Sequence, residues 1–320
     1  MWALAMQLTP RTLGGRRLGV KSHGMHDEDE LDPEALALRK AADALREPYS
    51  VQDVMPSAVY HYCSLEAAVN ILTKRTVRAS NIAHSNDPSE VAYGQRILES
   101  VVKQNFPIFS FRGVFDLVAD IDFYAACFSA VGDLLPQWRA YCANGKGLAL
   151  GVSTSVLVQH KDMLFVRMEY DASKQRQLAT ATIQIYEQPL ISAAANPARL
   201  SFLAQELALQ FVVLKGMFKS PAYESEREYR LFNTLPKPVA AHTTALLFRA
   251  GGAAGTVLVP FYDVLLTNSR DAAAATPFSE IIMGPCMPLR TTRDGLRLLL
   301  ETAALGQVPI KRSRVRMNCS

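Results

Sequence analysis

The sequence lacks the patterns that most directly announce a function. Its 320 residues contain no glycine-rich loop of the G-x-G-x-x-G or Walker type and no internal repeat. Its five cysteines, at positions 63, 127, 142, 286 and 319, form no C-x-x-C pair and show no metal-site spacing. This odd and scattered set indicates a reducing cytosol rather than a disulfide framework. The sequence therefore predicts neither a metal centre nor a disulfide-stabilised scaffold.

Long apolar runs and a strong charge bias are also missing. The longest apolar stretches are interrupted by Arg249 or Pro260, so we expect no membrane-spanning segment and no membrane partner. The net charge of +4 is too small to indicate nucleic acid by itself. Residues 1–24 lack the uninterrupted apolar stretch of a secretory signal. We expect a cytoplasmic protein, with export, or delivery to a host cell, as the alternative.

Strand-like and helix-like segments are mixed along the chain without regular alternation. This order favours an α+β fold with a mixed, mostly antiparallel sheet flanked by helices. We expect a disordered arm at 1–31, a helix and connector at 32–58, a single domain at 59–316 and a tail at 317–320. The strands are predicted at 59–62, 77–80, 123–129, 148–152, 164–170, 226–233, 245–248, 256–264 and 280–284. The helices are predicted at 32–46, 64–72, 89–103, 135–141, 174–190, 198–218 and 293–304.

The run Glu226-Arg227-Glu228-Tyr229-Arg230 places three alternating charges in a strand-like segment. Because strand side chains alternate between faces, Glu226, Glu228 and Arg230 are expected on one face. Two carboxylates there repel each other unless a cation or a ligand lies between them. Such a pair can stabilise an oxocarbenium-like transition state. The alternative is a surface strand carrying ordinary salt bridges.

Tyr60-His61-Tyr62 precedes Ser64, which can cap the following helix. A ligand at this position would also meet unpaired helix amides. His61 could then donate to a ribose hydroxyl or a carbonyl, while Tyr62 stacks on a planar ring. In the alternative interpretation, His61 satisfies a buried backbone group and Tyr62 packs in the core. The residues by themselves favour that alternative.

A third polar segment, Gln137-Trp138-Arg139-Ala140-Tyr141, crowds hydrogen-bonding and aromatic groups together. The guanidinium of Arg139 suits a bidentate phosphate contact. Equally, Trp138 could anchor the core while Arg139 pairs with a carboxylate such as Glu228. Cys127 and Cys142 have no neighbouring histidine in the sequence, so small buried residues are favoured over a cysteine hydrolase.

Taken in order, the motifs are similar to those of a large, mainly bacterial family labelled only as domain of unknown function 2971. The resemblance runs from about Val59 to about Arg316. The motifs that carry it are Tyr60-His61-Tyr62-Cys63-Ser64, Ser85-Asn86-Asp87-Pro88, Cys127-Phe128-Ser129, Gln137-Trp138-Arg139-Ala140-Tyr141, Glu226-Arg227-Glu228-Tyr229-Arg230, Ile281-Ile282-Met283-Gly284-Pro285 and Ser313-Arg314-Val315.

The layout also resembles that of ADP-ribosyltransferases, in which a first-strand histidine or arginine, a serine motif and a late Glu-x-Glu strand surround NAD. This resemblance implies a split sheet, Glu228 as the transition-state carboxylate, Glu226 as the group that orients the acceptor, and His61 on the ribose. It implies a nucleotide in a cleft, contacted by His61, Tyr62, Ser64, Ser129, Arg139, Tyr141 and Arg230. The acceptor would be protein, nucleic acid or a small molecule, as in a toxin, an effector or a phage-defence component. The alternative is a non-catalytic module that binds a nucleotide or a protein.

Overall fold

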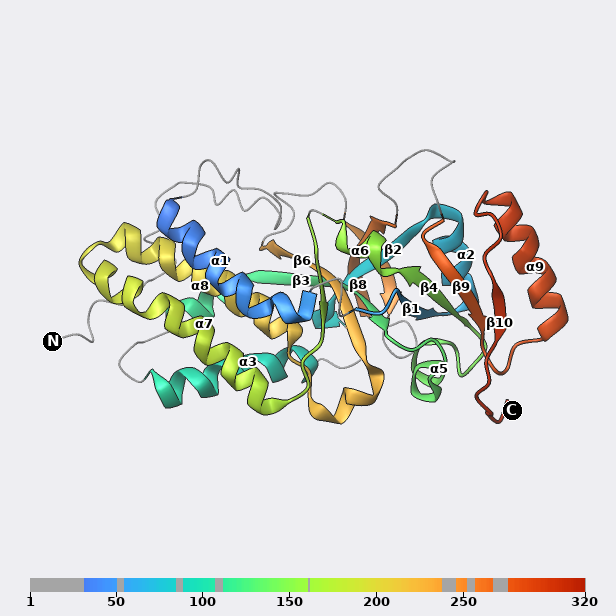
Figure 1. Cartoon of the computed structure of the whole chain (residues 1–320), viewed down its shortest axis with the longest axis horizontal. Coiled ribbons are helices and arrows are strands. Elements are labelled where there is room, and N and C mark those ends of the chain that lie inside the picture. Colours follow the sequence, from blue (N-terminus) through green and yellow to red (C-terminus); the bar gives the residue numbers. More distant parts are fainter. Residues whose placement is uncertain are drawn as a thin grey trace.

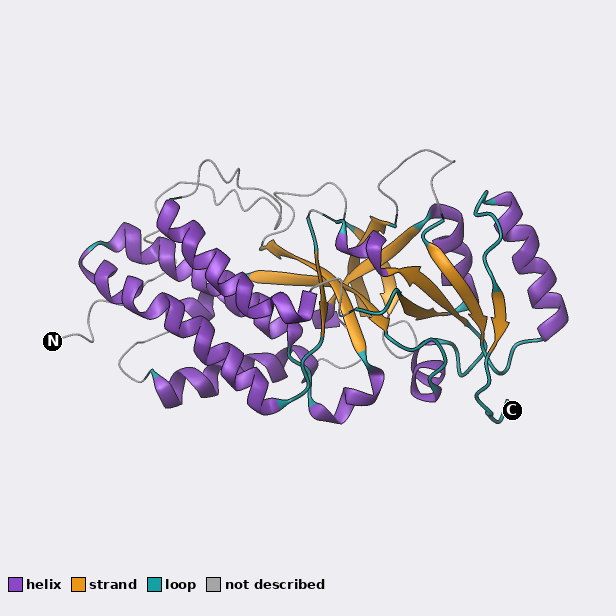
Figure 2. Ribbon diagram, in the orientation of Figure 1, coloured by secondary structure: helices purple, strands orange, loops and turns teal. Residues whose placement is uncertain are grey.

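The computed structural model describes residues 32–50, 55–84, 89–106, 112–160, 162–237, 246–251, 257–266 and 276–319. The arm expected at 1–31 and the motif Ser85-Asn86-Asp87-Pro88 lie outside these residues. Over the described residues, helices and a mixed, mostly antiparallel sheet form an α+β fold, which confirms the predicted class (Figures 1 and 2).

Helices gather at both ends of the molecule, with the sheet between them (Figure 1). Helices α1, α3, α7 and α8 lie at one end, while α2 and α9 lie at the other. The helices are α1 (Pro33–Ser50), α2 (Leu65–Lys74), α3 (Ser89–Asn105), α4 (Arg112–Ala119), α5 (Leu135–Tyr141), α6 (Thr154–Val158), α7 (Ala172–Ser192), α8 (Pro197–Met217) and α9 (Leu289–Thr302), with short 3-10 turns η4 (Ile82–His84), η5 (Ala193–Ala195) and η6 (Pro221–Glu226).

Ten described strands make one sheet. Along its main path the order is β10-β9-β4-β1-β3-β2-β8-β7, while β6 pairs with β3 and β5 pairs with β6. The one parallel pairing among these strands is β10 with β9. The strands are β1 (Ala58–Cys63), β2 (Thr76–Asn81), β3 (Ile121–Ser129), β4 (Leu148–Ser153), β5 (Leu164–Arg167), β6 (Glu228–Pro236), β7 (Leu247–Gly251), β8 (Val257–Leu265), β9 (Phe278–Met283) and β10 (Ile310–Arg312).

Strand β3 separates two hydrophobic cores because its side chains alternate between the faces of the sheet. Phe123 and Ala125 belong to a core shared with α1, α3, α4, α7 and α8. Tyr124, Ala126 and Phe128 belong to a second core on the other face, shared with α2 and α9. Burial of both faces explains the almost uninterrupted apolar run from Phe123 to Phe128.

The two edges of β3 are used differently. Strand β6 pairs with β3 along its whole length, from Ile121 to Ser129. The opposite edge is shared, because β1 pairs there at Ser129 while β2 pairs at Ala125 and Tyr124. The sheet therefore divides along this edge, and β1 and β2 diverge from each other next to Cys127.

Several element boundaries differ from the predictions. Helix α1 was expected to end near Arg46, but it continues through Pro48 to Ser50, and its last turn is held by a tertiary hydrogen bond from Tyr49. Strand β6 was expected to begin at Glu226, yet it begins at Glu228. Arg227 has φ 47°, a left-handed conformation that ends η6 and interrupts the extended backbone. Helices α4 and α6 and strand β10 are short elements that the sequence did not indicate.

The cysteine prediction was wrong for one pair. Cys286 and Cys319 form a disulfide across a separation of 33 residues. The parallel pairing of β10 with β9 brings the C-terminal segment back to the loop after β9, where Cys286 lies. Spacing along the sequence cannot reveal this, because the sheet creates the proximity.

Helix α8 bears on the expectation that the chain has no membrane-spanning segment. Helix α8 is long and apolar enough to cross a membrane by length and composition. However, 78% of its apolar window is buried inside the protein. Its side chains pack on α4, α7 and β3, as those of a core helix do.

Candidate functional site

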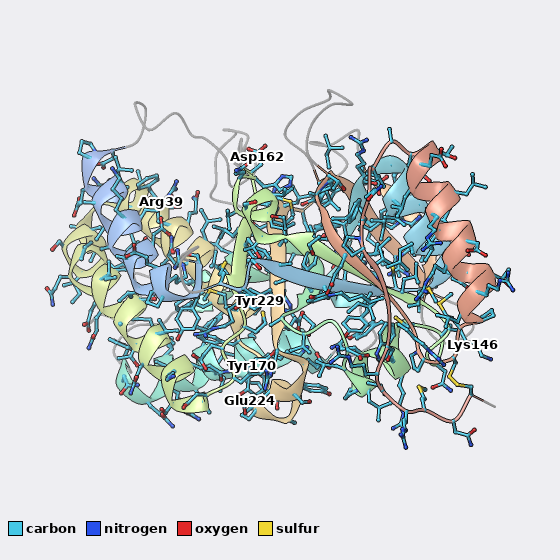
Figure 3. The ribbon with its side chains drawn as sticks, turned by 45° about the vertical axis from the view of Figure 1, so that its right-hand side comes forward. Arg39, Lys146, Asp162, Tyr170, Glu224 and Tyr229 are labelled. Atoms are coloured by element: carbon cyan, nitrogen blue, oxygen red, sulfur yellow. A yellow bond between two sulfur atoms is a disulfide. The ribbon has the colours of Figure 1, made fainter. Side chains whose placement is uncertain are left out.

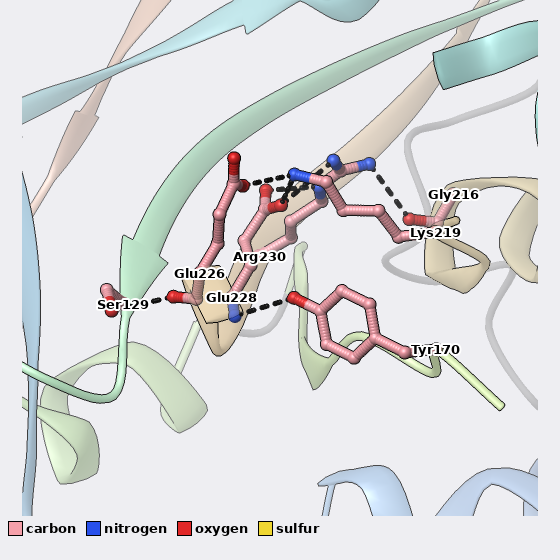
Figure 4. Close-up of polar contacts among 7 residues, drawn as sticks. All are labelled: Ser129, Tyr170, Gly216, Lys219, Glu226, Glu228 and Arg230. Carbon is pink, nitrogen blue, oxygen red and sulfur yellow. Dashed lines mark hydrogen bonds and ion pairs between the residues drawn. The ribbon is translucent and has the colours of Figure 1, made fainter. Parts of the chain in front are cut away.

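Glu228 opens strand β6 and lies at the centre of a buried ion cluster (Figure 4). The Lys219 ammonium donates to Oε2 of Glu228 at 2.5 Å, and Nε of Arg230 donates to Oε1 at 2.6 Å. All three side chains are at least 94% buried. Charges taken from water in this way need close partners, and here each carboxylate oxygen of Glu228 has one.

Glu226 completes the cluster from the end of η6. Its Oε2 accepts from the same Lys219 ammonium at 2.5 Å. Its side chain is 17% exposed, compared with 6% for Glu228. Lys219 is therefore the cation that two neighbouring carboxylates require between them. Glu226 is the carboxylate nearer to solvent.

The pKa of Glu228 reports the balance of forces in this cluster. Burial alone would raise the pKa, but the charges of Arg230 and Lys219 outweigh it and lower the pKa from 4.5 to about 2. Glu228 is consequently ionised at neutral pH. With two carboxylates and two cations, the four side chains have no net charge.

Backbone contacts fix the position of the carboxylate pair (Figure 4). The Ser129 hydroxyl donates to the carbonyl of Glu226 at 2.8 Å, and the amide of Glu228 donates to the Tyr170 hydroxyl at 2.9 Å. Nη1 of Arg230 donates to the Gly216 carbonyl at 3.2 Å. Strands β3 and β6 and the end of α8 thus all hold the site.

A second set of buried contacts positions the backbone of Lys219. The Lys219 amide donates to the carbonyl of Glu169 at 3.1 Å. Nε2 of Gln175 donates to the carbonyls of both Glu169 and Lys219, at 2.6 and 2.8 Å. The Glu169 carboxylate in turn accepts from the Tyr49 hydroxyl at 2.8 Å. Helix α1 is thereby connected to the segment that carries Lys219.

Tyr141 stands next to this cluster on helix α5. Burial of its hydroxyl, and then the negative charge of Glu226, raises its pKa. Smaller contributions in the same direction come from Cys127 and Glu228. Tyr141 as a whole residue is 43% exposed although its hydroxyl is buried, and Cys127 is exposed, so these two residues form the solvent side of the site.

His61 lies on the other face of the sheet from Glu228. Tyr60 pairs with Ser129, and Ser129 pairs with Glu228, so Tyr60 shares the face of Glu228 while His61 points away. Nδ1 of His61 lies 2.9 Å from the carbonyl oxygen of Cys127. A carbonyl can only accept, so Nδ1 carries the proton. His61 therefore bonds to a backbone carbonyl on the edge of β3, at the point where β1 and β2 diverge. This is the type of contact expected in the alternative interpretation, in which His61 satisfies a backbone group.

Three other predicted residues are placed apart from the ion cluster. The Tyr62 hydroxyl donates to the carbonyl of Val131 at 2.8 Å, and its ring packs edge-on against Trp138. The Ser64 hydroxyl caps α2 by accepting from the amide of Ala67 at 3.2 Å. Arg139 is exposed, and among the described residues no hydrogen bond or ion pair joins it to the cluster. Of the predicted set, Glu226, Glu228, Ser129, Arg230 and Tyr141 come together.

Sequence reasoning missed Lys219, Tyr170, Glu169 and Gln175. One signal could have indicated Lys219, because a buried carboxylate pair demands a cation and Lys219 follows directly after the apolar helix α8. The other three are ordinary residues in the sequence, and only the fold brings them to the site.

Together, the fold and this cluster describe an α+β protein with a buried charged centre beside a partly exposed acidic and aromatic surface. The family model described as "Protein of unknown function (DUF2971)" matches residues 137–231. That span runs from α5 into β6 and contains Tyr141, Lys219, Glu226, Glu228 and Arg230. The match supports the family suggested by the motif series, and its description assigns no activity. Searches of curated proteins and of solved structures give no match.

Proposed function

We propose that this chain is an NAD-dependent transferase whose active site is the Glu226–Glu228–Lys219 cluster. The single observation that carries the proposal is the carboxylate pair held by one lysine, with Glu226 as its more exposed member. Cleaving the nicotinamide–ribose bond leaves positive charge on the ribose carbon, which a nearby carboxylate stabilises.

The roles that we propose within the pair follow from burial, and they reverse the roles that the resemblance implied for Glu226 and Glu228. Glu226 faces the ligand, stabilises the developing positive charge and takes the proton that the acceptor loses on attack. The bonding electrons leave with nicotinamide, which departs neutral. Glu228 has both its oxygens occupied by Lys219 and Arg230, so it positions the lysine and does not itself contact the ribose. In this proposal Tyr141, on the solvent side, contacts the nicotinamide.

The sheet order supports this proposal only in part. The strands that carry His61, Ser129 and Glu228 are neighbours in the order β1-β3-β6. Because His61 points to the opposite face of the sheet, the role on the ribose that the resemblance implied for it is not part of the proposal. Ser129 lies between the other two strands and bonds to the backbone of Glu226.

The test measures, by chromatography, the nicotinamide that the full chain releases from NAD. The Glu226→Gln variant should lose activity because the amide carries no charge, whereas Glu224→Gln should retain it. Glu224 is the matched control because it is an exposed carboxylate in the same 3-10 turn. Equal turnover by both variants would remove Glu226 from the mechanism, and no release from the wild type with any class of acceptor would reject the transferase.

A second candidate function is a binding module without catalysis. It is favoured by the complete pairing of Glu228, whose charge is neutralised within the protein. Under this alternative, NAD or another nucleotide raises the melting temperature of the chain, and no nicotinamide is formed. Measuring the thermal shift and product release on the same sample separates the two functions.

A further inference from the structure

The positive charge of the chain is concentrated at its C-terminal end. Residues 284–320 contain seven lysine or arginine residues and two acidic residues, which gives +5, compared with +4 for the whole chain. The rest of the chain therefore carries one net negative charge. Such an uneven distribution makes one end of the molecule attractive to an anionic polymer.

The last basic segment is fixed to the protein, although a basic run at a chain end is ordinarily a solvated tail. It begins as β10, the edge strand of the sheet. Beyond β10, the Ser313 hydroxyl and the Arg314 amide donate to the two carboxylate oxygens of Asp133, at 2.6 and 2.7 Å. The indole of Trp138 on α5 donates to the same carboxylate at 2.8 Å. The segment is thereby attached to α5.

Apolar contacts and the disulfide complete this attachment. Val315 and Met317 pack on the small core that contains Trp138. Two residues after Met317, Cys319 is joined to Cys286 in the loop that follows β9. The backbone of this segment is therefore held at both of its ends and in the middle.

The arginines that alternate with these anchoring side chains are exposed. We call Arg312, Arg314 and Arg316 the arginine ladder. An extended backbone places every second residue about 6–7 Å apart, so the ladder is a regular row of cations. Among the described residues, none of the three guanidinium groups forms a hydrogen bond or an ion pair. Their charges are therefore available to an external anion.

Two more exposed cations come from α5 and from the turn that follows it. Arg139 lies on α5, and Lys146 follows Gly145 in the turn. A side chain at Gly145 would lie 3.1 Å from the sulfur of Met317, so this turn is next to the end of the ladder. Figure 3 shows Lys146 at this end of the molecule. Neither cation has an ion pair within the part of the chain that the structure describes.

The type and the arrangement of these cations indicate the ligand. The guanidinium of arginine is a planar fork that matches phosphate oxygens. A row of such groups suits a polymer with regularly repeated phosphates better than a single small anion. A flexible single strand can follow a straight row, whereas the backbone of a duplex winds away from it.

We propose that the arginine ladder, with Arg139 and Lys146, binds single-stranded nucleic acid through its phosphates. The contacts are made to the backbone of the strand, so binding is independent of base sequence. They consist of charge and hydrogen bonds, and no covalent step is involved. None of the residues in the Glu226–Glu228–Lys219 cluster is required.

The experiment measures fluorescence anisotropy of a labelled oligothymidylate of about 16 nucleotides, titrated with the full chain at several salt concentrations. Replacing all three arginines of the ladder by glutamine should weaken binding about tenfold or more at low salt. Because each phosphate contact to a single strand contributes about 0.7 to the salt dependence, the slope of log affinity against log salt should become shallower by about 2.

The matched control is the triple variant Lys40→Gln, Arg96→Gln and Lys103→Gln. It removes the same charge from exposed positions on α1 and α3, at the opposite end of the molecule from β10 (Figure 1). This variant should bind as the wild type does. A second variant, Arg139→Gln with Lys146→Gln, leaves the C-terminal segment intact and should reduce the salt slope by about 1.

Four outcomes would overturn the proposal. They are no binding by the wild type, an equal loss of affinity in the ladder variant and its control, displacement of the labelled strand by oligoglutamate as readily as by unlabelled oligothymidylate, and tighter binding of a duplex of the same length. The third would assign the surface to acidic protein segments. Glu226→Gln should bind the strand as the wild type does, so this test is independent of NAD cleavage.

Discussion

Lys219 and Glu228 are both buried, and the ammonium nitrogen of Lys219 lies 2.5 Å from Oε2 of Glu228. Neither charge has bulk water around it, so each depends on the other for its solvation. The Lys219 ammonium also bridges Glu226 and Glu228. The site is therefore sensitive to loss of a single side chain.

We expect Lys219→Met to lower the free energy of unfolding by about 3–5 kcal/mol, because it leaves the Glu228 charge buried with one cation fewer. Urea denaturation measures this loss. The control is Lys237→Gln, since Lys237 pairs with Asp122 at 3.5 Å with 49% of its side chain exposed. That change should cost about 0–1 kcal/mol, as exposed pairs do. Adding Glu228→Gln to Lys219→Met should recover part of the loss, and a strictly additive result would contradict the pairing.

The pH dependence of stability follows from the lowered pKa of Glu228. The folded value of about 2 lies below the ordinary 4.5, so the folded state favours ionised Glu228. This contribution is fully present above about pH 4.5 and is lost as the pH falls toward 2. It amounts to about 3 kcal/mol. Denaturation series between pH 6 and pH 2.5 should show a steeper acid loss for the wild type than for Glu228→Gln, and superimposable profiles would count against the assignment.

Tyr49→Phe tests the connection between α1 and the segment that carries Lys219. Loss of the bond to the buried Glu169 carboxylate should cost about 1 kcal/mol. Tyr229→Phe is the comparison, because among the described residues the Tyr229 hydroxyl makes no hydrogen bond; it should cost less than about 0.5 kcal/mol. Figure 3 shows the position of Tyr229. Equal losses in the two variants would mean that the Tyr49 hydroxyl contributes nothing specific.

Reducing the Cys286–Cys319 disulfide should lower the melting temperature. Closing a 33-residue separation stabilises the folded chain by up to about 4 kcal/mol in the chain-entropy account. Differential scanning calorimetry with and without dithiothreitol measures the shift. Cys319→Ser should melt at the temperature of the reduced wild type and should not respond to the reductant. If the melting temperature of the wild type does not change on reduction, the disulfide adds no stability.

Most of the regular elements could be predicted because their signals are local. The apolar run Phe123–Ser129 and the Ser64 cap each reflect residues next to one another in the chain. Short elements such as α6, with five residues, carry too little periodicity to be recognised. The start of β6 was misplaced because nothing in the sequence marks Arg227 for a left-handed backbone.

For the candidate site, the sequence identified the carboxylates but not how they are held. Glu226 and Glu228 stand out because carboxylate pairs beside apolar residues are costly to bury. Their partner Lys219 belongs to a different segment, and its position depends on the bridge between Glu169 and Phe218. His61 was grouped with them by motif order, yet the pairing of Tyr60 with Ser129 turns it to the other face.

The sequence by itself determined the α+β class, the main helices and strands, and the need for a cation between two acidic side chains. Periodicity and charge repulsion are properties of neighbouring residues, so they can be read along the chain. Only the tertiary structure decided which cation fills that place, which face His61 occupies and which cysteines join. Those outcomes depend on strand register and on the packing of distant segments, where a shift of one residue moves a side chain to the opposite face of the sheet.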